Sequence, residues 1–299
     1  MAGDALYAST ALVFTGLGTN GSTAFTDSSA TPKVPSGFGN AVLSNTHPLF
    51  GGTTIRFDGT DDYIGIPSSS ADFNLGTGDF CLDGWYYPVS AVANNRVYQS
   101  RNGDLAAGLY LSHQDAANLQ FYCSTDGTSF VGSGIVIPVT QNAWNYFQIN
   151  RVSGLCKAYV GSAQVGVNYS VTGSLFYQSS DVAVVGGQNT PSRTINGSIA
   201  DLRLTKGSAR AVAMPVSRVP TGLGSVSGTV RDSTGALCAR TVRLLRRDTG
   251  VVLGSAISDS ATGAFSIFTP TLDEVVRIVH SGATTAPLEN DLIDRVIPA

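Results

Sequence analysis

With 299 residues, the chain can bury the core of one large or two medium-sized domains without disulfide staples. Only 13% of the residues are charged, and two Glu and three Lys stand against 34 Gly, so strands joined by tight turns are favoured over helices. The formal net charge of -3, with no run of Lys or Arg, lacks the basic patch that neutralises phosphates, so we expect no nucleic acid partner.

The N-terminus, MAGDALYASTALVF, has no basic segment ahead of its short apolar run. No stretch of the chain approaches the roughly 20 apolar residues that a membrane-spanning helix needs. We therefore expect neither a signal peptide nor insertion into a membrane.

Short apolar or alternating runs recur from residue 10 to about residue 205, among them ALVF, TIRF, YIGI, GLYLS, LQFYCS, WNYFQINR and IADLRLT. No pattern of helical period persists for three turns, so this part predicts an all-β fold and, by its length, a two-sheet sandwich. In FCLDGWYYP both faces of the strand carry bulky side chains. That pattern predicts a central strand, covered on both sides and ended by Pro88.

An acidic segment, FDGTDDY, separates two of these runs. Asp58, Asp61 and Asp62, together with Gly59, predict a hairpin turn in which carboxylates accept hydrogen bonds from nearby backbone amides. The same carboxylates could hold calcium, which takes roughly six to eight oxygen ligands. Because the spacing is not that of an EF-hand loop, we favour the turn and keep calcium as the alternative.

Four cysteines, Cys81, Cys123, Cys156 and Cys238, are widely spaced, and no C-x-x-C pair occurs. With only three His in the chain, a zinc site is not expected. Three of the cysteines lie in strand-like runs, so we expect buried thiols rather than disulfides.

Between about residues 206 and 224 the alternation gives way to Pro and Gly. We place a linker at 211–224, between a domain at 1–210 and a second domain at 225–299. Strands of the second domain are expected near 226–231, 240–247, 251–258 and 264–269, with a last one in LIDRVIPA. The joints DSTG, RDTG and DSATG place Asp at the start and Gly at the end of turns, so a small antiparallel β-sandwich is expected.

The first domain resembles the laminin-G-like, concanavalin A-like jelly-roll family, in the form common in bacteriophage virion proteins. The resemblance rests on FTGLGTNGSTAFTDSS, FGGTTIRFDGTDDYIGIPSSSADFNLGTGDFCLDGWYYP, NAWNYFQINRVSGLCKAYVGSAQVG and INGSIADLRLTKGSAR, in this order. The second domain resembles immunoglobulin-like or carboxypeptidase-regulatory-like modules of virion proteins, through GTVRDSTGALCARTVRLLRRDTG and LIDRVIPA. The combination implies a virion component.

The resemblance also implies a calcium site where the final strand of such jelly rolls meets the N-terminal loop. Here that site would involve Asp201 and Asp27, but Thr15 stands where relatives often carry Asp, which subtracts one ligand. An ion pair of Asp201 with Arg203 or another Arg is the alternative, and we slightly favour it.

Catalysis is not expected. Glycoside hydrolysis normally needs two carboxylates that face each other across the scissile bond, and glucanases similar to this family carry an E-x-D-x-E type of motif on one strand. The first domain has no Glu, since Glu274 and Glu289 both lie in the second, and no strand carries D-x-D-x-D. His47, His113 and His280 come with no G-x-S-x-G motif, so a serine hydrolase is not supported either.

Aromatic side chains could bind sugar rings, although most should belong to the core. The sequence does not identify glycan-binding residues. The loops SRNGD (100–104) and STDGTS (124–129) are expected loop tips, where binding residues usually lie. The available aromatic side chains are Trp85, Tyr86, Tyr87, Tyr98, Tyr110 and Tyr122.

Three functions stay open. We favour a non-enzymatic tail or baseplate adhesion protein that binds host-surface glycans, with weak sites multiplied by many copies on one particle. A capsid or tail decoration protein without a receptor role is the alternative, and a glycan depolymerase is a remote one. We expect location on the virion, assembled in the host cytoplasm, with other virion proteins as partners and a homo-oligomer or multiple copies per particle.

Overall fold

The structure is a computed structural model that describes residues 4–68, 71–90, 92–189, 193–217, 224–232, 234–246, 252–269, 275–280 and 291–296. The chain divides into two compact units. The larger comprises Ser9–Val219, and the smaller comprises Pro220–Ala299 with Met1–Ala8. Within the described part, no helix is long and apolar enough to cross a membrane. Glu274 and Glu289 lie outside the described residues.

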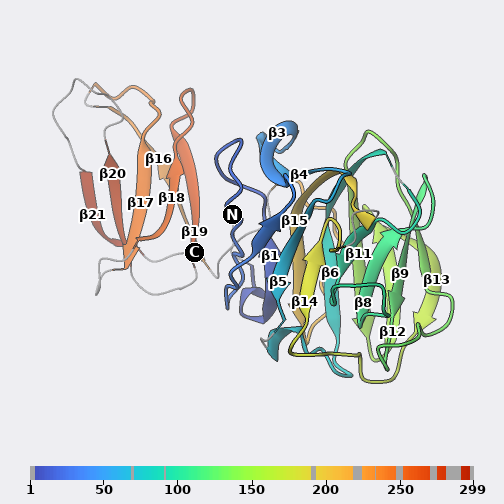
Figure 1. Ribbon diagram of the computed structural model, residues 1–299. Helices are drawn as coiled ribbons and strands as arrows, with labels where there is room; N and C mark the ends of the chain where they lie inside the picture. Colours follow the sequence, from blue (N-terminus) through green and yellow to red (C-terminus); the bar gives the residue numbers. More distant parts are fainter. Residues whose placement is uncertain are drawn as a thin grey trace. The chain divides into compact units, whose positions relative to one another are not determined.

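The larger unit consists of two antiparallel sheets that pack face to face (Figure 1). Sheet A has the order β13-β12-β11-β6-β15-β4-β3, and β1 also pairs with β15. Its strands are β1 Thr10–Phe14, β3 Val42–Leu49, β4 Gly52–Asp58, β6 Phe80–Ser90, β11 Asn145–Val152, β12 Leu155–Val160, β13 Ala163–Ser170 and β15 Asn196–Lys206.

Sheet B has the order β10-β9-β8-β7-β14-β5-β2. Its strands are β2 Ser36–Phe38, β5 Tyr63–Pro67, β7 Arg96–Gln99, β8 Leu109–His113, β9 Asn118–Cys123, β10 Ile135–Pro138 and β14 Val182–Val185. Short 3-10 helices, η1 Tyr7–Ser9 and η2 Ala71–Phe73, accompany the strands. The expected all-β, two-sheet sandwich is confirmed.

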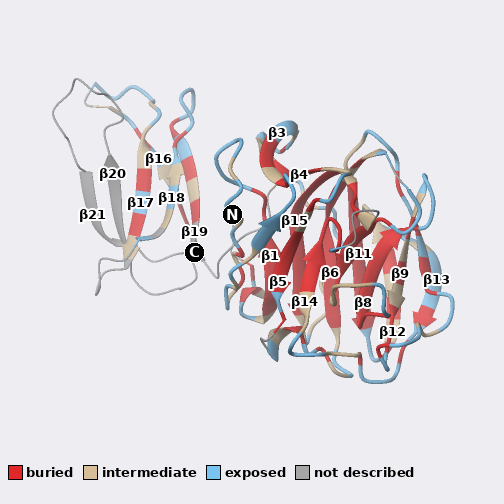
Figure 2. Ribbon diagram, in the orientation of Figure 1, coloured by how far each residue is buried: buried red, intermediate tan, exposed pale blue. Residues whose placement is uncertain are grey.

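One hydrophobic core fills the space between the sheets, and buried residues run along the strands of both (Figure 2). The alternation of apolar and polar residues along each strand explains this core, because successive side chains point to opposite faces of the sheet. In β6, Phe80, Leu82 and Tyr86 enter this core. Cys81, Cys123 and Cys156 are also fully buried, as expected for thiols in strands.

Strand β6 is central and buried on both faces from Phe80 to Tyr86, as its sequence predicts. The prediction that Pro88 ends the strand is wrong, since β6 continues to Ser90. Pro88 lies where the pairing with β15 shifts register between Asn196 and Gly197. A proline is tolerated there because a bulge does not need its missing N–H.

The acidic segment after β4 does not close a hairpin. Strand β4 pairs within sheet A, whereas β5 pairs with β14 and β2 in sheet B. Residues 59–62 are therefore a corner that carries the chain from one sheet to the other, and the prediction of a hairpin joint is wrong.

The smaller unit contains a two-stranded sheet, β16-β19, and a four-stranded sheet, β18-β17-β20-β21. Strand β20 was not expected from the sequence. Asp232 and Asp259 accept hydrogen bonds from backbone amides of their own turns, as the joints DSTG and DSATG predict. The strands are β16 Gly224–Thr229, β17 Thr241–Arg246, β18 Val252–Ile257, β19 Ala264–Thr269, β20 Val275–His280 and β21 Asp291–Val296.

Candidate functional site

A β-bulge in β7 sets the chemistry of the outer face of sheet B. The pairing of β7 with β8 shifts register between Arg96 and Tyr98. Val97 and Tyr98 both enter the core, so Arg96 and Gln99 share the outer face although they are three residues apart. Bulges of this kind re-aim side chains next to functional sites.

An aromatic row lies beside these residues. Tyr110 of β8 stands opposite Tyr122 of β9, and their ring centroids are 6.1 Å apart. Phe130 contacts both, at 4.8 Å from Tyr110 and stacked at 4.9 Å on Tyr122. Tyr110 is buried, while Tyr122 and Phe130 are half-buried. The row therefore has one ring packed against the protein and two rings that are partly exposed to solvent.

A polar cluster adjoins the row. The Arg96 guanidinium carbon lies 4.5 Å from the Tyr110 ring centroid. Oδ1 of Asp104 accepts hydrogen bonds from Nε2 of Gln188 at 2.8 Å and from Arg96 at 3.5 Å, and Nε of Arg193 is 3.6 Å away. Loops that follow β7 and β14 thus meet at one carboxylate. We call the aromatic row and the polar cluster together the sheet-B surface.

Some hydrogen-bonding groups of the polar cluster have no partner among the described residues. The Asp104 side chain is 61% exposed, and its contacts to described residues all involve Oδ1, which leaves Oδ2 open. Oε1 of Gln188 is buried without a hydrogen-bond partner among the described residues. Burial lowers the pKa of Arg96, and the charge of Arg193 acts in the same direction, whereas Tyr110 and Asp104 oppose the shift.

This arrangement suits a hydroxylated, partly apolar ligand. The exposed Asp104 carboxylate and the partly exposed Arg193 guanidinium can bind hydroxyl groups at fixed positions, and exposed ring surface can pack against C–H groups. Of the residues considered from sequence, Tyr110, Tyr122 and the loop 100–104 belong to the surface. Arg96, Gln188, Arg193 and Phe130 were missed, because no local pattern reveals a bulge or brings together residues 84 positions apart.

The remaining aromatic residues considered from sequence lie elsewhere. Tyr86 and Tyr98 are fully buried in the core. Trp85 and Tyr87 lie on the outer face of sheet A, where Trp85 packs with Tyr146. The loop at 124–129 holds Asp126, whose carboxylate accepts hydrogen bonds from its own loop amides and serves the turn.

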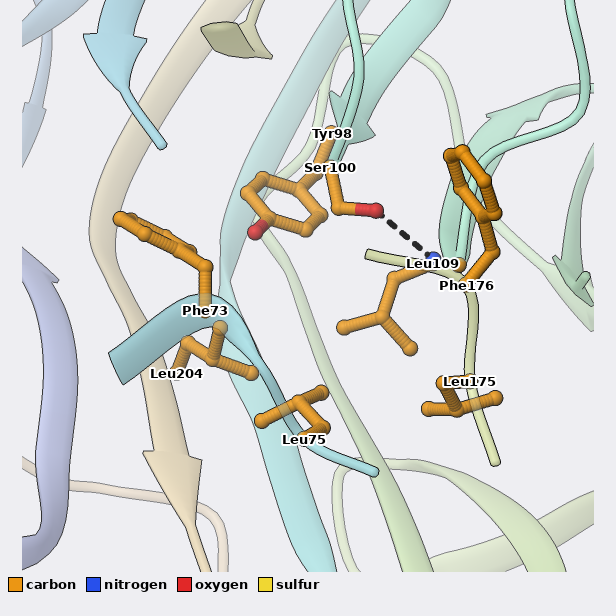
Figure 3. A pocket seen from close by; sticks show the side chains of 9 residues that line it. Phe73, Leu75, Tyr98, Ser100, Leu109, Leu175, Phe176 and Leu204 are labelled. Carbon is orange, nitrogen blue, oxygen red and sulfur yellow. Dashed lines mark hydrogen bonds between the residues drawn. The ribbon is translucent and has the colours of Figure 1, made fainter. Parts of the chain in front are cut away.

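Figure 3 shows a cavity between the sheets, and its volume is about 10 Å³. Small-molecule sites are roughly 300–1,000 Å³, so this cavity is a packing feature with room for one water at most. Within it, Oγ of Ser100 accepts a hydrogen bond from the Leu109 amide at 3.0 Å. The lining residues are Phe73, Leu75, Tyr98, Ser100, Gly108, Leu109, Leu175, Phe176 and Leu204.

The calcium candidates Asp27 and Asp201 both lie beside β1. Asp27 is buried, and its carboxylate accepts hydrogen bonds from the amides of Val13, Ser29 and Lys33 and from the Ser29 hydroxyl, at 2.9–3.0 Å. Asp201 is buried in a bulge of β15 at φ 50°, and its amide donates to the Thr15 carbonyl. Calcium binding at these two residues stays a prediction.

Arg203, the suggested ion-pair partner of Asp201, forms a bidentate pair with Asp83 on neighbouring β6. Nε of Arg203 lies 3.1 Å from Oδ1 of Asp83, and NH2 lies 2.7 Å from Oδ2. Tyr146 donates a further hydrogen bond to Asp83. This buried group fixes the outer face of sheet A.

Asp58, Asp61 and Asp62 gather at the corner after β4. Asp62 is buried, and its two oxygens accept hydrogen bonds from the amides of Asn40, at 2.6 Å, and Asp58, at 2.7 Å. Asp58 accepts from the Thr60 amide and the Asn40 side chain. Burial raises the pKa of Asp62, and the two amide donors oppose the shift. In the described part of the chain, no group of three or more His, Cys, Asp or Glu could hold a metal ion.

Comparisons with known proteins give a consistent fold. Residues 58–211 match the family model described as the concanavalin A-like lectin/glucanases superfamily. The binding domain of Paraclostridial Mosquitocidal Protein 1 is 13% identical with a TM-score of 0.52, covering 98% of this chain and 74% of that one. No curated protein sequence matches.

Two structures of the botulinum neurotoxin DC binding domain are similar as well. The complex with SialylT is 12% identical and covers 97% of this chain and 69% of that one. The complex with rat synaptotagmin II is 13% identical and covers 98% and 70%. Both have a TM-score of 0.52, so the likeness is one of fold.

Proposed function

Because the chain belongs to the concanavalin A-like lectin/glucanases superfamily, we propose that it is a non-catalytic glycan-binding protein that contacts its ligand through the sheet-B surface. The observation that carries this proposal is Arg96, whose guanidinium lies 4.5 Å from the Tyr110 ring of the aromatic row and 3.5 Å from the open Asp104 carboxylate, so that row and carboxylate flank one side chain. The row supplies apolar contact to a sugar ring, and the carboxylate accepts hydrogen bonds from its hydroxyl groups.

The distribution of carboxylates supports binding without cleavage. The larger unit has no Glu, and Asp27, Asp62 and Asp83 are each buried and occupied by hydrogen-bond donors. A depolymerase would need one protonated and one ionised carboxyl group on opposite sides of a glycosidic bond. Asp104, the open carboxylate of the surface, contacts Arg96, Arg193 and Gln188 and has no second carboxylate among these partners.

On the particle, the protein acts as a tail or baseplate adhesion component, in many copies and in contact with other virion proteins. The resemblance of its sequence segments to those of phage virion proteins supports this placement. Several weak sites held on one particle reach high avidity through effective concentration. The smaller unit, with its resemblance to immunoglobulin-like modules, is then the anchor.

A glycan array of bacterial surface polysaccharides tests the binding role. Asp104→Ala and Tyr122→Ala should each weaken binding about tenfold, the equivalent of roughly 1.4 kcal/mol. Asp259→Ala, which removes the same charge from an exposed turn of the smaller unit, is the matched control and should bind as the wild type does.

The adsorption of virions to host cells, measured with and without antibody against this protein, tests the role on the virion. Adsorption that the antibody blocks would support an adhesion role. If no glycan or cell binds, and virions without the protein fall apart, the decoration role replaces adhesion. New reducing ends released from a bound polysaccharide would instead identify a depolymerase.

A further inference from the structure

The outer face of sheet A carries a second aromatic surface, distinct from the sheet-B surface. Both tryptophans of the chain, Trp85 and Trp144, belong to it. His47 stacks on Tyr87 with ring centroids 4.2 Å apart, and Trp144 meets Tyr87 edge-on at 5.5 Å. We call this group, with Phe50, Arg56 and Ser198 described below, the sheet-A surface.

Strand register places a cation beside these rings. Arg56 of β4 stands opposite Ser198 of β15, and Ser198 stands opposite Tyr87 of β6. Residues directly opposite on antiparallel strands share a face, and strands lie about 4.8 Å apart, so the three side chains form a row roughly 10 Å long. Nδ1 of His47 hydrogen-bonds to the Ser198 hydroxyl at 3.0 Å, which ties the overlying ring to the row.

Much of this surface is reachable. His47, Arg56, Tyr87 and Trp144 are half-buried. Phe50, at the turn between β3 and β4, is 44% exposed and lies edge-on to Trp85 at 5.7 Å.

Two polar groups of the surface have unused binding capacity. Nε1 of Trp85 is buried without a hydrogen-bond partner among the described residues, and the residue is only 7% exposed. A buried donor of this kind is costly, and its presence calls for a physical reason. The Arg56 guanidinium forms no hydrogen bond or ion pair with another described residue.

We propose that the sheet-A surface binds a saccharide that carries a carboxylate. The sugar ring packs on Trp144 and His47, and Arg56 pairs with the carboxylate. When Phe50 turns aside, a sugar oxygen accepts the hydrogen bond from Trp85. Phe50, whose ring lies edge-on to Trp85, has a left-handed φ of 47° and precedes Gly51 at φ 75°. The Phe50 ring is therefore held against Trp85 by one tight turn. The proposal extends the proposed glycan-binding function but uses the opposite sheet.

Intrinsic fluorescence tests this surface selectively, because both tryptophans lie on it. The probes are methyl α-galacturonide and methyl α-galactoside, which differ only in the carboxylate at C6. The uronide should shift the tryptophan emission at concentrations about tenfold lower than the galactoside, since a charge-assisted hydrogen bond contributes more than a neutral one.

Variants identify the contacts. Arg56→Gln should reduce the affinity for the uronide about tenfold, to that for the galactoside, whereas Arg243→Gln, at an exposed position of β17, should change nothing. Trp85→Phe should lower the affinity for both probes, and the fluorescence of Trp144 still reports their binding. Thermal unfolding of each variant shows that it is folded.

The outcomes separate the two proposals. If Asp104→Ala weakens array binding while the tryptophan response to the uronide persists, both surfaces bind. If Asp104→Ala and Tyr122→Ala both leave array binding unchanged while the tryptophan response persists, the sheet-B proposal fails alone. No emission change with either probe, or equal affinities that Arg56→Gln leaves unaltered, overturns the sheet-A proposal.

Discussion

Two fully buried tyrosines in the core of the larger unit differ in the partners of their hydroxyl groups. The Tyr86 hydroxyl lies 2.7 Å from Nε2 of His113. Since Nδ1 of His113 donates to the Asp115 carbonyl at 3.1 Å, Nε2 of the neutral ring accepts from Tyr86. The Tyr98 hydroxyl, beside the small cavity of Figure 3, has no partner among the described residues.

Replacing each tyrosine by phenylalanine should therefore have unequal effects on the free energy of unfolding. Tyr86→Phe leaves the His113 acceptor buried and unpaired, a loss of about 1–3 kcal/mol. Tyr98→Phe removes a hydroxyl without a partner and should change stability by less than about 0.5 kcal/mol. Urea denaturation of the two variants measures both values. Equal losses would show that the Tyr98 hydroxyl is bonded after all.

At the scale of an element, one carboxylate holds the N-terminal segment against sheet A. Of the four hydrogen bonds that Asp27 accepts, one comes from Val13 of β1 and three come from Ser29 and Lys33, so the carboxylate joins residues 27–33 to that strand. Nζ of Lys33 donates to the Ala11 carbonyl at 2.7 Å, which adds a second connection to the same strand. A calcium ion at Asp27 would have to displace donors that are already well placed.

Asp27→Asn should destabilise the larger unit by about 2–4 kcal/mol, because the amide nitrogen would face donors where the carboxylate accepted. Asp115→Asn, the same change at an exposed turn, should cost much less. Thermal unfolding of the wild type should give the same Tm in EDTA and in calcium. A calcium-dependent rise in Tm that Asp27→Asn abolishes would show instead that Asp27 is a metal ligand.

At the scale of the larger unit as a whole, the buried His113 and the half-buried His47 make stability depend on pH. Burial lowers the pKa of His113, against the opposing effect of Asp115. Burial and, to a smaller extent, the charge of Arg56 lower the pKa of His47. The unfolded value is about 6.5, so between the folded and unfolded values the unfolded chain binds more protons.

The free energy of unfolding should therefore fall as the pH drops below about 6.5, by at most about 1.4 kcal/mol per pH unit for each histidine. His113→Gln should lower stability at neutral pH and flatten this dependence, and His47→Gln should flatten it less because His47 is more exposed. Chemical denaturation between about pH 7.5 and pH 5 measures the slope. An unchanged slope in both variants would contradict the assignment. Burial raises the pKa of Asp62, so this residue has the opposite effect at lower pH: its contribution to the free energy of unfolding increases as the pH falls.

The sequence by itself determined the all-β class, the central position of β6, the thiols that the core contains, and the absence of Glu from the larger unit. Period-two alternation and turn residues are local signals, so they can be recognised without knowing which strands are neighbours. The same local signals misplaced the end of β6 at Pro88 and took the corner at Asp58–Asp62 for a hairpin.

Only the tertiary structure decided which side chains meet. The bulge in β7 turned Arg96 and Gln99 to one face, and the pairing of β7 with β14 brought Gln188 to Asp104. Long-range pairing likewise set Arg56 in line with Ser198 and Tyr87. Alternation fixes which residues of one strand share a face, but strand order, register and bulges fix what lies beside them, and those depend on contacts across the whole sheet.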